Sequence, residues 1–272
     1  MWIKKEKEPI WMFLIWVVII WVLSVTALKL LTPYSITYGE TGKMTIGYLA
    51  YVVIGMLFTT PGPVIALYIT LRRKEHITLK EYLKRIIYTK EPTKAVIITG
   101  TFCTLALVFA IIEGVPNGEP WYLLPIGFLL MIPFVGVAEE TGWRGFLQPA
   151  FDKKIIFPFS TLAVAAIWFI WHIDQWFDPT SNHYGDSLFG FAINIIIWAF
   201  ALAAIYKVTK SVIACAIYHA FIDALGAIYD WNLLFDTFPG DVVTNVYRLV
   251  ILSASVFLWL YTDRTEKSKG LE

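Results

Sequence analysis

The sequence predicts an all-α, polytopic membrane protein of about eight transmembrane helices, with both termini in the cytoplasm. Of its 272 residues, 58% are hydrophobic and only 16% are charged, whereas about a quarter of the residues of a soluble domain are charged. Apolar runs of about 17 to 25 residues recur along the chain, and this is the length that a helix needs to cross a bilayer. The runs are continuous rather than alternating, which argues against a membrane β-barrel.

Eight apolar runs divide the chain, and we treat residues 1–272 as one membrane-embedded domain with a functional core at about 121–228. The first run follows Lys4, Lys5 and Lys7 as the core of a signal peptide would. It is too long for that role and more runs follow, so we expect a retained first helix. The runs cover residues 10–31, 44–71, 95–112, 121–148, 157–172, 188–206, 211–228 and 247–261.

Lysine and arginine gather in alternate connections, which sets the predicted orientation, because cytoplasmic loops carry an excess of these residues. The connections 113–120, 173–187 and 229–246 contain neither residue, and 32–43 contains only Lys43. The basic segments are the N-terminus, the connection 72–94, the pair Lys153 and Lys154, the pair Lys207 and Lys210, and the tail with Arg264, Lys267 and Lys269. This alternation predicts an even number of spans and two cytoplasmic termini.

Composition also excludes some partners. The net charge is +1, which indicates no affinity for nucleic acid. Cys103 and Cys215, the only two cysteines, both lie in apolar runs. Their number and spacing exclude a disulfide framework and a CxxC metal site.

The second run contains Thr59-Thr60-Pro61-Gly62-Pro63. Each proline removes a backbone donor, so we expect the helix to kink or break here. The break can be a packing irregularity or can open a lateral gate to the interior, and both interpretations stay open.

The basic connection predicts an amphipathic helix within about 77–90. Thr78 and Glu81 have the spacing of a capping box at its start. The apolar residues that share one helical face are Leu79, Tyr82, Leu83, Ile86 and Ile87. Such a helix would lie on the cytoplasmic leaflet, and the alternative is a solvated connector.

The fourth run holds two carboxylates and a guanidinium, in Glu139-Glu140-Thr-Gly-Trp-Arg144. The first helix breaker after it is Pro149, which would place Glu139 about 15 Å deep at 1.5 Å per residue. Glu140 and Arg144 are i,i+4 neighbours and are expected to pair. Glu139 then lacks a local partner and is free to act as a general base or acid. Gly142 would allow another backbone to approach.

Three further ionisable residues interrupt the later apolar runs. His172 ends the aromatic stretch from Trp168, roughly 22 Å into its run. His219 and Asp223 are i,i+4 neighbours on one side of the seventh run. The alternatives to a catalytic role are an interfacial histidine and a His–Asp pair that joins helices. His183 and Asp186, in the connection 173–187, are expected to be solvated rather than metal-binding.

Together these groups suit hydrolysis without a covalent intermediate. A carboxylate and a histidine can hold and deprotonate a water molecule, while a second histidine with a polar neighbour can stabilise an oxyanion. The depths of Glu139, His172, His219 and Asp223 overlap, so we expect them to meet inside the membrane.

The order EExxxR (Glu139 to Arg144), WxxxH (Trp168 to His172) and HxxxD (His219 to Asp223) resembles the three motifs of the CPBP intramembrane proteases. This family includes CAAX prenyl endoproteases of the Ras-converting-enzyme type and bacteriocin-processing or immunity proteins. The resemblance implies that Glu139 and His172 activate water, that His219 and Asp223 form an oxyanion hole, and that Glu140 and Arg144 support them. It implies no cofactor.

Two positions depart from that pattern. Trp168 stands where phenylalanine is more usual, and both are apolar aromatic residues. Asp223 stands where the prenyl-protease branch usually has asparagine. An ionised Asp223 would repel an oxyanion, so it would have to be protonated or to orient His219, which affects the expected specificity for CAAX tails more than proteolysis.

The resemblance implies a multi-pass protein in the bilayer, with a peptide or protein substrate such as a prenylated C-terminal CAAX tail that loses its last three residues. The site would then open toward the cytoplasmic side. One alternative is a zinc protease with the metal held by His172, His219 and a carboxylate. Another is a non-enzymatic immunity or scaffold protein, or a transporter that uses these residues as a proton relay.

Overall fold

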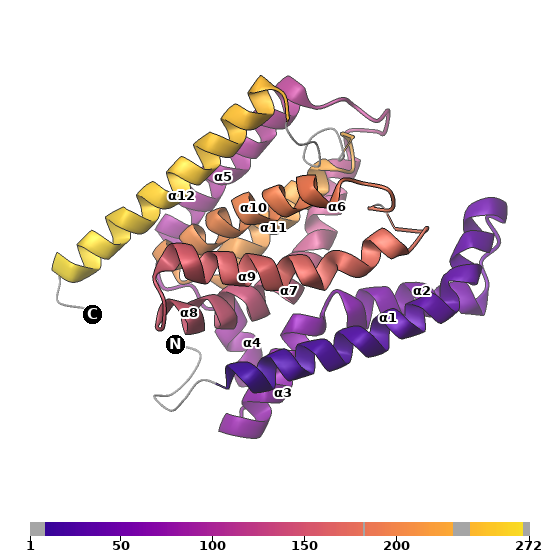
Figure 1. Ribbon diagram of the computed structural model, residues 1–272, viewed down its shortest axis with the longest axis horizontal. Coiled ribbons are helices and arrows are strands. Elements are labelled where there is room, and N and C mark those ends of the chain that lie inside the picture. The colour runs from indigo at the N-terminus through magenta and orange to yellow at the C-terminus, as the bar shows by residue number, and fades with distance from the viewer. Residues whose placement is uncertain (1–8, 182, 231–239, 269–272) are drawn as a thin grey trace.

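The computed structural model describes residues 9–181, 183–230 and 240–268. Lys4, Lys5, Lys7 and Lys269, which contribute to the predicted orientation, lie outside these ranges. The described chain is helical and contains no strand, only an isolated pairing of Pro116 with Tyr229 (Figure 1). The helical elements are α1 (Ile10–Thr41), α2 (Ile46–Ile54), η1 (Gly55–Thr59), α3 (Gly62–Glu75), α4 (Leu79–Ile87), α5 (Pro92–Glu113), α6 (Leu123–Met131), η2 (Ile132–Val137), α7 (Ala138–Gly142), η3 (Trp143–Leu147), α8 (Gln148–Asp152), α9 (Phe157–His172), η4 (Ile173–Phe177), α10 (Leu188–Thr209), α11 (Val212–Leu225) and α12 (Val242–Ser268).

Each of the eight predicted runs coincides with a helix or with a pair of helices. Six helices in the described chain are long and apolar enough to cross a membrane, and the bent pair α2–η1 with α3 forms a seventh candidate. The eighth run is α11, which is apolar but only 14 residues long. The all-α membrane fold is therefore confirmed, while the count of eight spans stays a prediction.

The second run breaks where its prolines predict. The helices Ile46–Thr59 and Gly62–Glu75 meet at 51°. The bend brings Pro63 against α7, where a Cβ atom on Gly142 would lie 2.6 Å from the Pro63 Cβ and 3.1 Å from its carbonyl oxygen. The close approach expected at Gly142 is thus present, and it joins the first half of the chain to the segment that carries Glu139 and Glu140.

The fourth run is one continuous helix from Leu123 to Asp152, so it does extend past Ala138 as expected. Pro149 does not end it. The turn before Pro149, η3, is a π-helix, and so is η2 on the other side of α7. A π turn widens the backbone, which makes room for the proline ring that an α-helical turn would exclude. The two glutamates therefore lie in one α turn between two wide turns.

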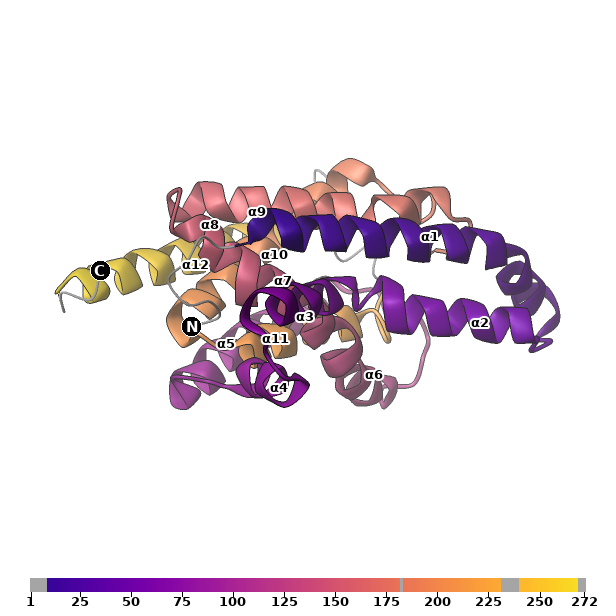
Figure 2. The ribbon, with the colours of Figure 1, turned by 90° about the horizontal axis from the view of Figure 1, so that it is seen from below.

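The interior helix of the molecule is α10. Seventy-two per cent of its most apolar stretch is buried, against 22% for α1 and 28% for α12. α9, α5, α11 and α12 pack around it, while α1 runs along α2 and α3 at the other side of the molecule (Figures 1 and 2). The outer helices present large apolar side chains such as Trp11, Leu23 and Phe257 to their surroundings. This belt suits contact with lipid chains.

The capping box predicted for the amphipathic helix is present. The Thr78 hydroxyl accepts from the Glu81 N–H, and the Glu81 carboxylate accepts from the Thr78 N–H at 2.8 Å. The apolar face of α4 has a buried part and an exposed part. Tyr82 and Ile86 are buried, with the Tyr82 hydroxyl donating to the Val64 carbonyl, whereas the other three apolar residues, Leu79, Leu83 and Ile87, are exposed.

The basic connections lie together at one end of the bundle. The Thr89 and Ser211 hydroxyls are hydrogen bonded, and Lys207 Nζ lies 2.6 Å from Asp263 Oδ1 near the end of α12. The first turn of α1 and the last described turn of α12 lie at this same end in Figure 1. The acidic and neutral connections α5–α6 and α9–α10 lie at the opposite end.

Candidate active site

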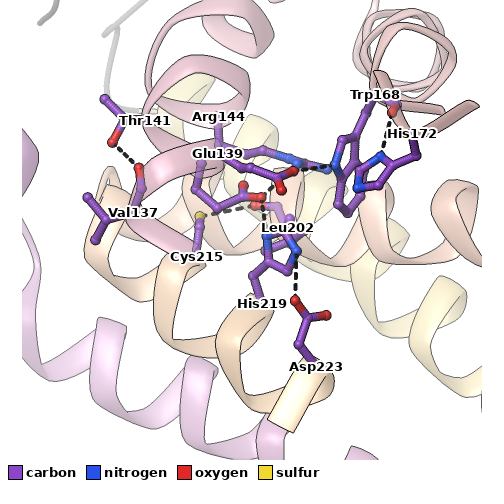
Figure 3. Close-up of polar contacts among 11 residues, drawn as sticks. Val137, Glu139, Thr141, Arg144, Trp168, His172, Leu202, Cys215, His219 and Asp223 are labelled. Atoms are coloured by element: carbon purple, nitrogen blue, oxygen red, sulfur yellow. Dashed lines mark hydrogen bonds and ion pairs between the residues drawn. The ribbon is translucent and has the colours of Figure 1, made fainter. Parts of the chain in front are cut away.

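Glu139 is buried in the bundle, with 3% of its surface exposed. Its Oε2 accepts a hydrogen bond of 2.7 Å from the Trp168 indole nitrogen of α9 (Figure 3). Glu139 has no partner of opposite charge on its own helix, as the sequence predicts. The tryptophan donor comes from another helix, and nothing in the spacing of the motifs indicates it.

Glu140 forms the expected pair with Arg144, since Arg144 Nη1 donates to Glu140 Oε1 at 2.9 Å. Both side chains are fully buried. The same oxygen also accepts from His219 Nδ1 at 2.8 Å. The guanidinium lies 4.5 Å from the centre of the Trp168 ring. Glu140 thus joins α7, η3 and α11 and holds His219 in a fixed orientation.

His172 stands at the end of α9, one turn after Trp168. Its Nδ1 lies 2.9 Å from the Trp168 carbonyl oxygen. A carbonyl can only accept, so Nδ1 carries the hydrogen and Nε2 of the neutral ring keeps its lone pair. One residue, Trp168, therefore positions both Glu139, through its indole, and His172, through its backbone.

Asp223 lies one turn beyond His219 on α11. Its Oδ2 is 3.6 Å from His219 Nε2, and its side chain is 25% exposed. His219 consequently has a carboxylate oxygen at each ring nitrogen. Of the two roles left open for Asp223, this arrangement favours orientation of the imidazole.

A cavity of about 830 Å³ connects these groups. Glu139, His172, His219 and Asp223 all lie in its wall, together with Trp168. Glu140 and Arg144 do not line it. The structure thus brings the four residues predicted to do chemistry into one cavity wall, with the supporting pair behind that wall and bonded to it through His219.

His183 departs from its expected solvation. It stacks on Trp176 with ring centres 5.0 Å apart and lines the cavity, and its Nδ1 lies 3.2 Å from Asp186 Oδ2. Both partners are mostly buried. The aromatic residues that surround it come from α9–η4 and α10, so the local sequence around His183 gives no sign of this burial.

Thr60, beside the helix break, also lines the cavity. This keeps the gate interpretation of the Thr59–Pro63 segment open. Among the described residues, no three His, Cys, Asp or Glu side chains are grouped so that they could hold a metal ion.

The position of the cavity bears on two predictions. Beyond the four candidate residues, its wall includes Asn117, His183 and Asp230, which belong to the Lys- and Arg-poor connections. None of the described residues in the wall belongs to a basic connection. The wall thus reaches the Lys- and Arg-poor connections, while the cytoplasmic termini and the cytoplasmic opening of the site both stay predictions.

Comparison with known proteins supports the resemblance drawn from the motifs. Residues 120–225 match the family model described as Type II CAAX prenyl endopeptidase Rce1-like. No curated protein and no solved structure matches the chain. The matched segment contains all three motifs, from Glu139 to Asp223. Over these residues the chain is similar to the Rce1-like family, as the motifs predict, and this family implies a protease embedded in the membrane.

Proposed function

We propose that this protein is an intramembrane endopeptidase that uses a water molecule activated by Glu139 and His172. The observation that carries the proposal is that the Glu139 carboxylate and His172 share one cavity and are both positioned by Trp168. A buried carboxylate that is not held in an ion pair on its own helix suits a general base, because its oxygens stay available to a water molecule.

In the proposed reaction, a water molecule between Glu139 and His172 gives a proton to Glu139 while its oxygen bonds to the carbonyl carbon of the peptide. His172 Nε2, with its lone pair, orients the water by accepting its second hydrogen. The resulting tetrahedral intermediate carries the negative charge on the former carbonyl oxygen. Glu139 then returns the proton to the peptide nitrogen, the C–N bond breaks, and a carboxylic acid and an amine leave.

His219 is proposed to stabilise the oxyanion. Its Nδ1 is hydrogen bonded to Glu140 at 2.8 Å, whereas Asp223 Oδ2 is 3.6 Å from Nε2, beyond hydrogen-bond distance. The ring can carry a hydrogen on both nitrogens, and the N–H at Nε2 is then the donor proposed for the oxyanion. Donors fixed before the reaction stabilise such a charge at little cost in reorganisation. Asp223 is proposed to act through His219, because its own carboxylate would repel the oxyanion when ionised.

The decisive experiment is peptide cleavage by the purified protein in detergent. We expect Glu139→Gln to lower kcat by about 10²–10⁴-fold, the usual contribution of a general base. Glu119→Gln is the matched control, because this carboxylate is exposed in the connection between α5 and α6, and it should cleave like the wild type. Full activity of Glu139→Gln would refute the mechanism.

Two additional experiments test whether the activity needs a metal ion and whether the substrate must be prenylated. Activity should survive chelation, and loss on chelation with recovery on adding zinc would favour the zinc alternative. The name of the family suggests a prenylated CAAX tail as substrate. Cleavage of matched peptides with and without a prenyl group tests that suggestion directly.

A further inference from the structure

We infer that the active-site cavity opens to the non-cytoplasmic side of the membrane, so that its substrates are peptide segments presented from outside rather than prenylated tails held at the cytoplasmic leaflet. The inference rests on the proposed peptidase function for the word substrate, but its geometric part does not depend on catalysis.

The basic residues are distributed unequally over the two ends of the bundle. At one end lie the connection between α3 and α5, the turn after α8 and the last turn of α10, with Lys80, Lys154 and Lys207 among their basic residues. At the other end, the described connections α5–α6 and α9–α10 contain no Lys or Arg. The bias of short loops sets orientation, so the first end is cytoplasmic.

The helices that carry the site run away from the basic end. α9 starts at the basic end and places His172 at its last residue, about 22 Å away at 1.5 Å per residue. α11 also starts there and places Asp223 two residues before its end. His172 and Asp223 are therefore separated from the basic end by most of the length of these helices, and His219 by about half of α11.

The wall of the cavity extends beyond the candidate residues. From the candidate residues it continues to Asn117 between α5 and α6, to Gln175 and His183 after α9, and to Asp230 after α11. Asn117 and Asp230 lie side by side, since Asn117 N–H donates to the Ile228 carbonyl and Asp230 N–H to the Val115 carbonyl. The cavity thus extends from the site toward the end whose connections are poor in basic residues, where the turn between α1 and α2 contributes Lys43.

The charge of the wall fits this assignment. Glu139, Asp223 and Asp230 line the cavity, while no described Lys or Arg does so. The free carboxylate at the end of a CAAX tail would meet no ammonium or guanidinium group there. A neutral or basic peptide segment, cleaved at an internal bond, suits this wall better.

Cysteine labelling tests the opening without requiring activity. With Cys103 and Cys215 replaced by alanine, single cysteines are placed at Glu119 and Tyr184 near the cavity, and at Lys80 and Lys154 at the basic end. All four positions are exposed. In a bacterial host, a membrane-impermeant maleimide should label Glu119→Cys and Tyr184→Cys in spheroplasts, and Lys80→Cys and Lys154→Cys only in inverted vesicles. The reverse pattern, or labelling of both pairs from one side, would overturn the inference.

The second measurement adds a charged, impermeant peptide to the two membrane preparations, with Glu139→Gln membranes subtracting host proteases. Cleavage by spheroplasts and not by inverted vesicles is expected. Cleavage by inverted vesicles alone would overturn the inference while the peptidase function stands. If neither preparation nor the detergent-purified protein cleaves, the proposed function fails, and the labelling still decides on which side the cavity opens.

Discussion

Glu140 has the densest set of polar contacts in the site, because one of its oxygens accepts from both Arg144 and His219. Burying charges costs several kcal/mol per ion unless they are paired and hydrogen bonded. The pair therefore stabilises the fold only while both partners remain. Its neighbour Glu139 is not part of this ion pair. Glu140 therefore has the structural role, while Glu139 is the residue proposed to act in catalysis.

This division predicts different effects of two similar substitutions. Glu140→Ala leaves Arg144 charged and buried, so the free energy of unfolding should fall by about 3–5 kcal/mol. Glu139→Gln should unfold near the wild-type temperature, since no ion pair is lost. Thermal unfolding in detergent, followed by tryptophan fluorescence, measures both. Equal stability of the two variants would contradict the assignment of Glu140 as the structural member.

The sequence predicts the contacts between residues of one helix, but it does not predict the contacts between different helices. The Glu140–Arg144 pair follows from i,i+4 spacing on a single helix. The donor from Trp168 to Glu139 and the bond from His219 to Glu140 join different helices. Their existence depends on the rotation of each helix about its axis, which hydrophobic runs without an amphipathic pattern do not fix.

Among the helices near the site, η2 and α11 approach each other closely. A Cβ atom on Gly136 would lie 2.8 Å from the carbonyl carbon and 2.9 Å from the Cα of Ala216. Both are backbone atoms that cannot turn aside. Small residues let helices in a membrane pack this closely, and here the contact sets the distance between Glu139 and His219.

Gly136→Ala should therefore destabilise the protein by about 1–3 kcal/mol, the usual cost of overpacking, and lower activity by moving α11. Gly100→Ala is the matched control, because a Cβ atom at this position on α5 would have nothing within 4 Å. Alanine there should be neutral or stabilise the helix by up to about 1 kcal/mol. Melting temperatures and kcat of both variants test the contact, and equal behaviour would contradict it.

The capping box of α4 predicts a dependence on pH. Hydrogen bonds from the Thr78 N–H and hydroxyl lower the pKa of Glu81 from its ordinary value of 4.5. A carboxylate whose folded pKa is depressed stabilises the fold above its unfolded pKa, and this contribution is lost as the pH falls through the folded value. The start of α4 should therefore fray in acid.

Hydrogen exchange of the α4 amides measures this. The difference in protection between wild type and Glu81→Ala should be present at neutral pH and should vanish well below pH 4.5, where Glu81 is protonated in both folded and unfolded chains. Lys80→Ala, an exposed change in the same turn, controls for helix propensity. A difference that persists in acid would mean that the cap acts without its charge.

On the scale of the whole molecule, hydropathy and the alternation of basic loops predict the membrane class and the order of the helices. They do not predict that α10 occupies the centre, or that α1 and α12 are peripheral. All the long runs are similarly apolar, so burial among them is decided by packing. The side on which the cavity opens is another property of the assembled bundle, and no individual run specifies it.

At the basic end of the bundle, Lys207 of α10 pairs with Asp263 of α12, and their side chains are 16% and 31% exposed. Such a pair is worth about 0.2–1 kcal/mol and is weakened by salt. Lys207→Asp and Asp263→Lys should each lower the melting temperature, and the double exchange should restore most of the loss. If the two effects simply add, the pair does not couple α10 to α12.

The two π turns on either side of α7 also determine where this helix tolerates a change of length. A π turn closes over one residue more than an α turn. Loss of one residue from 132–137 or 145–147 can therefore be absorbed as a return to α geometry, with the flanking segments nearly in place. The loss of Thr141 or Gly142 would rotate everything beyond it by about 100° and separate Arg144 from Glu140. Insertions and deletions, and not only substitutions, are thus constrained residue by residue along this stretch.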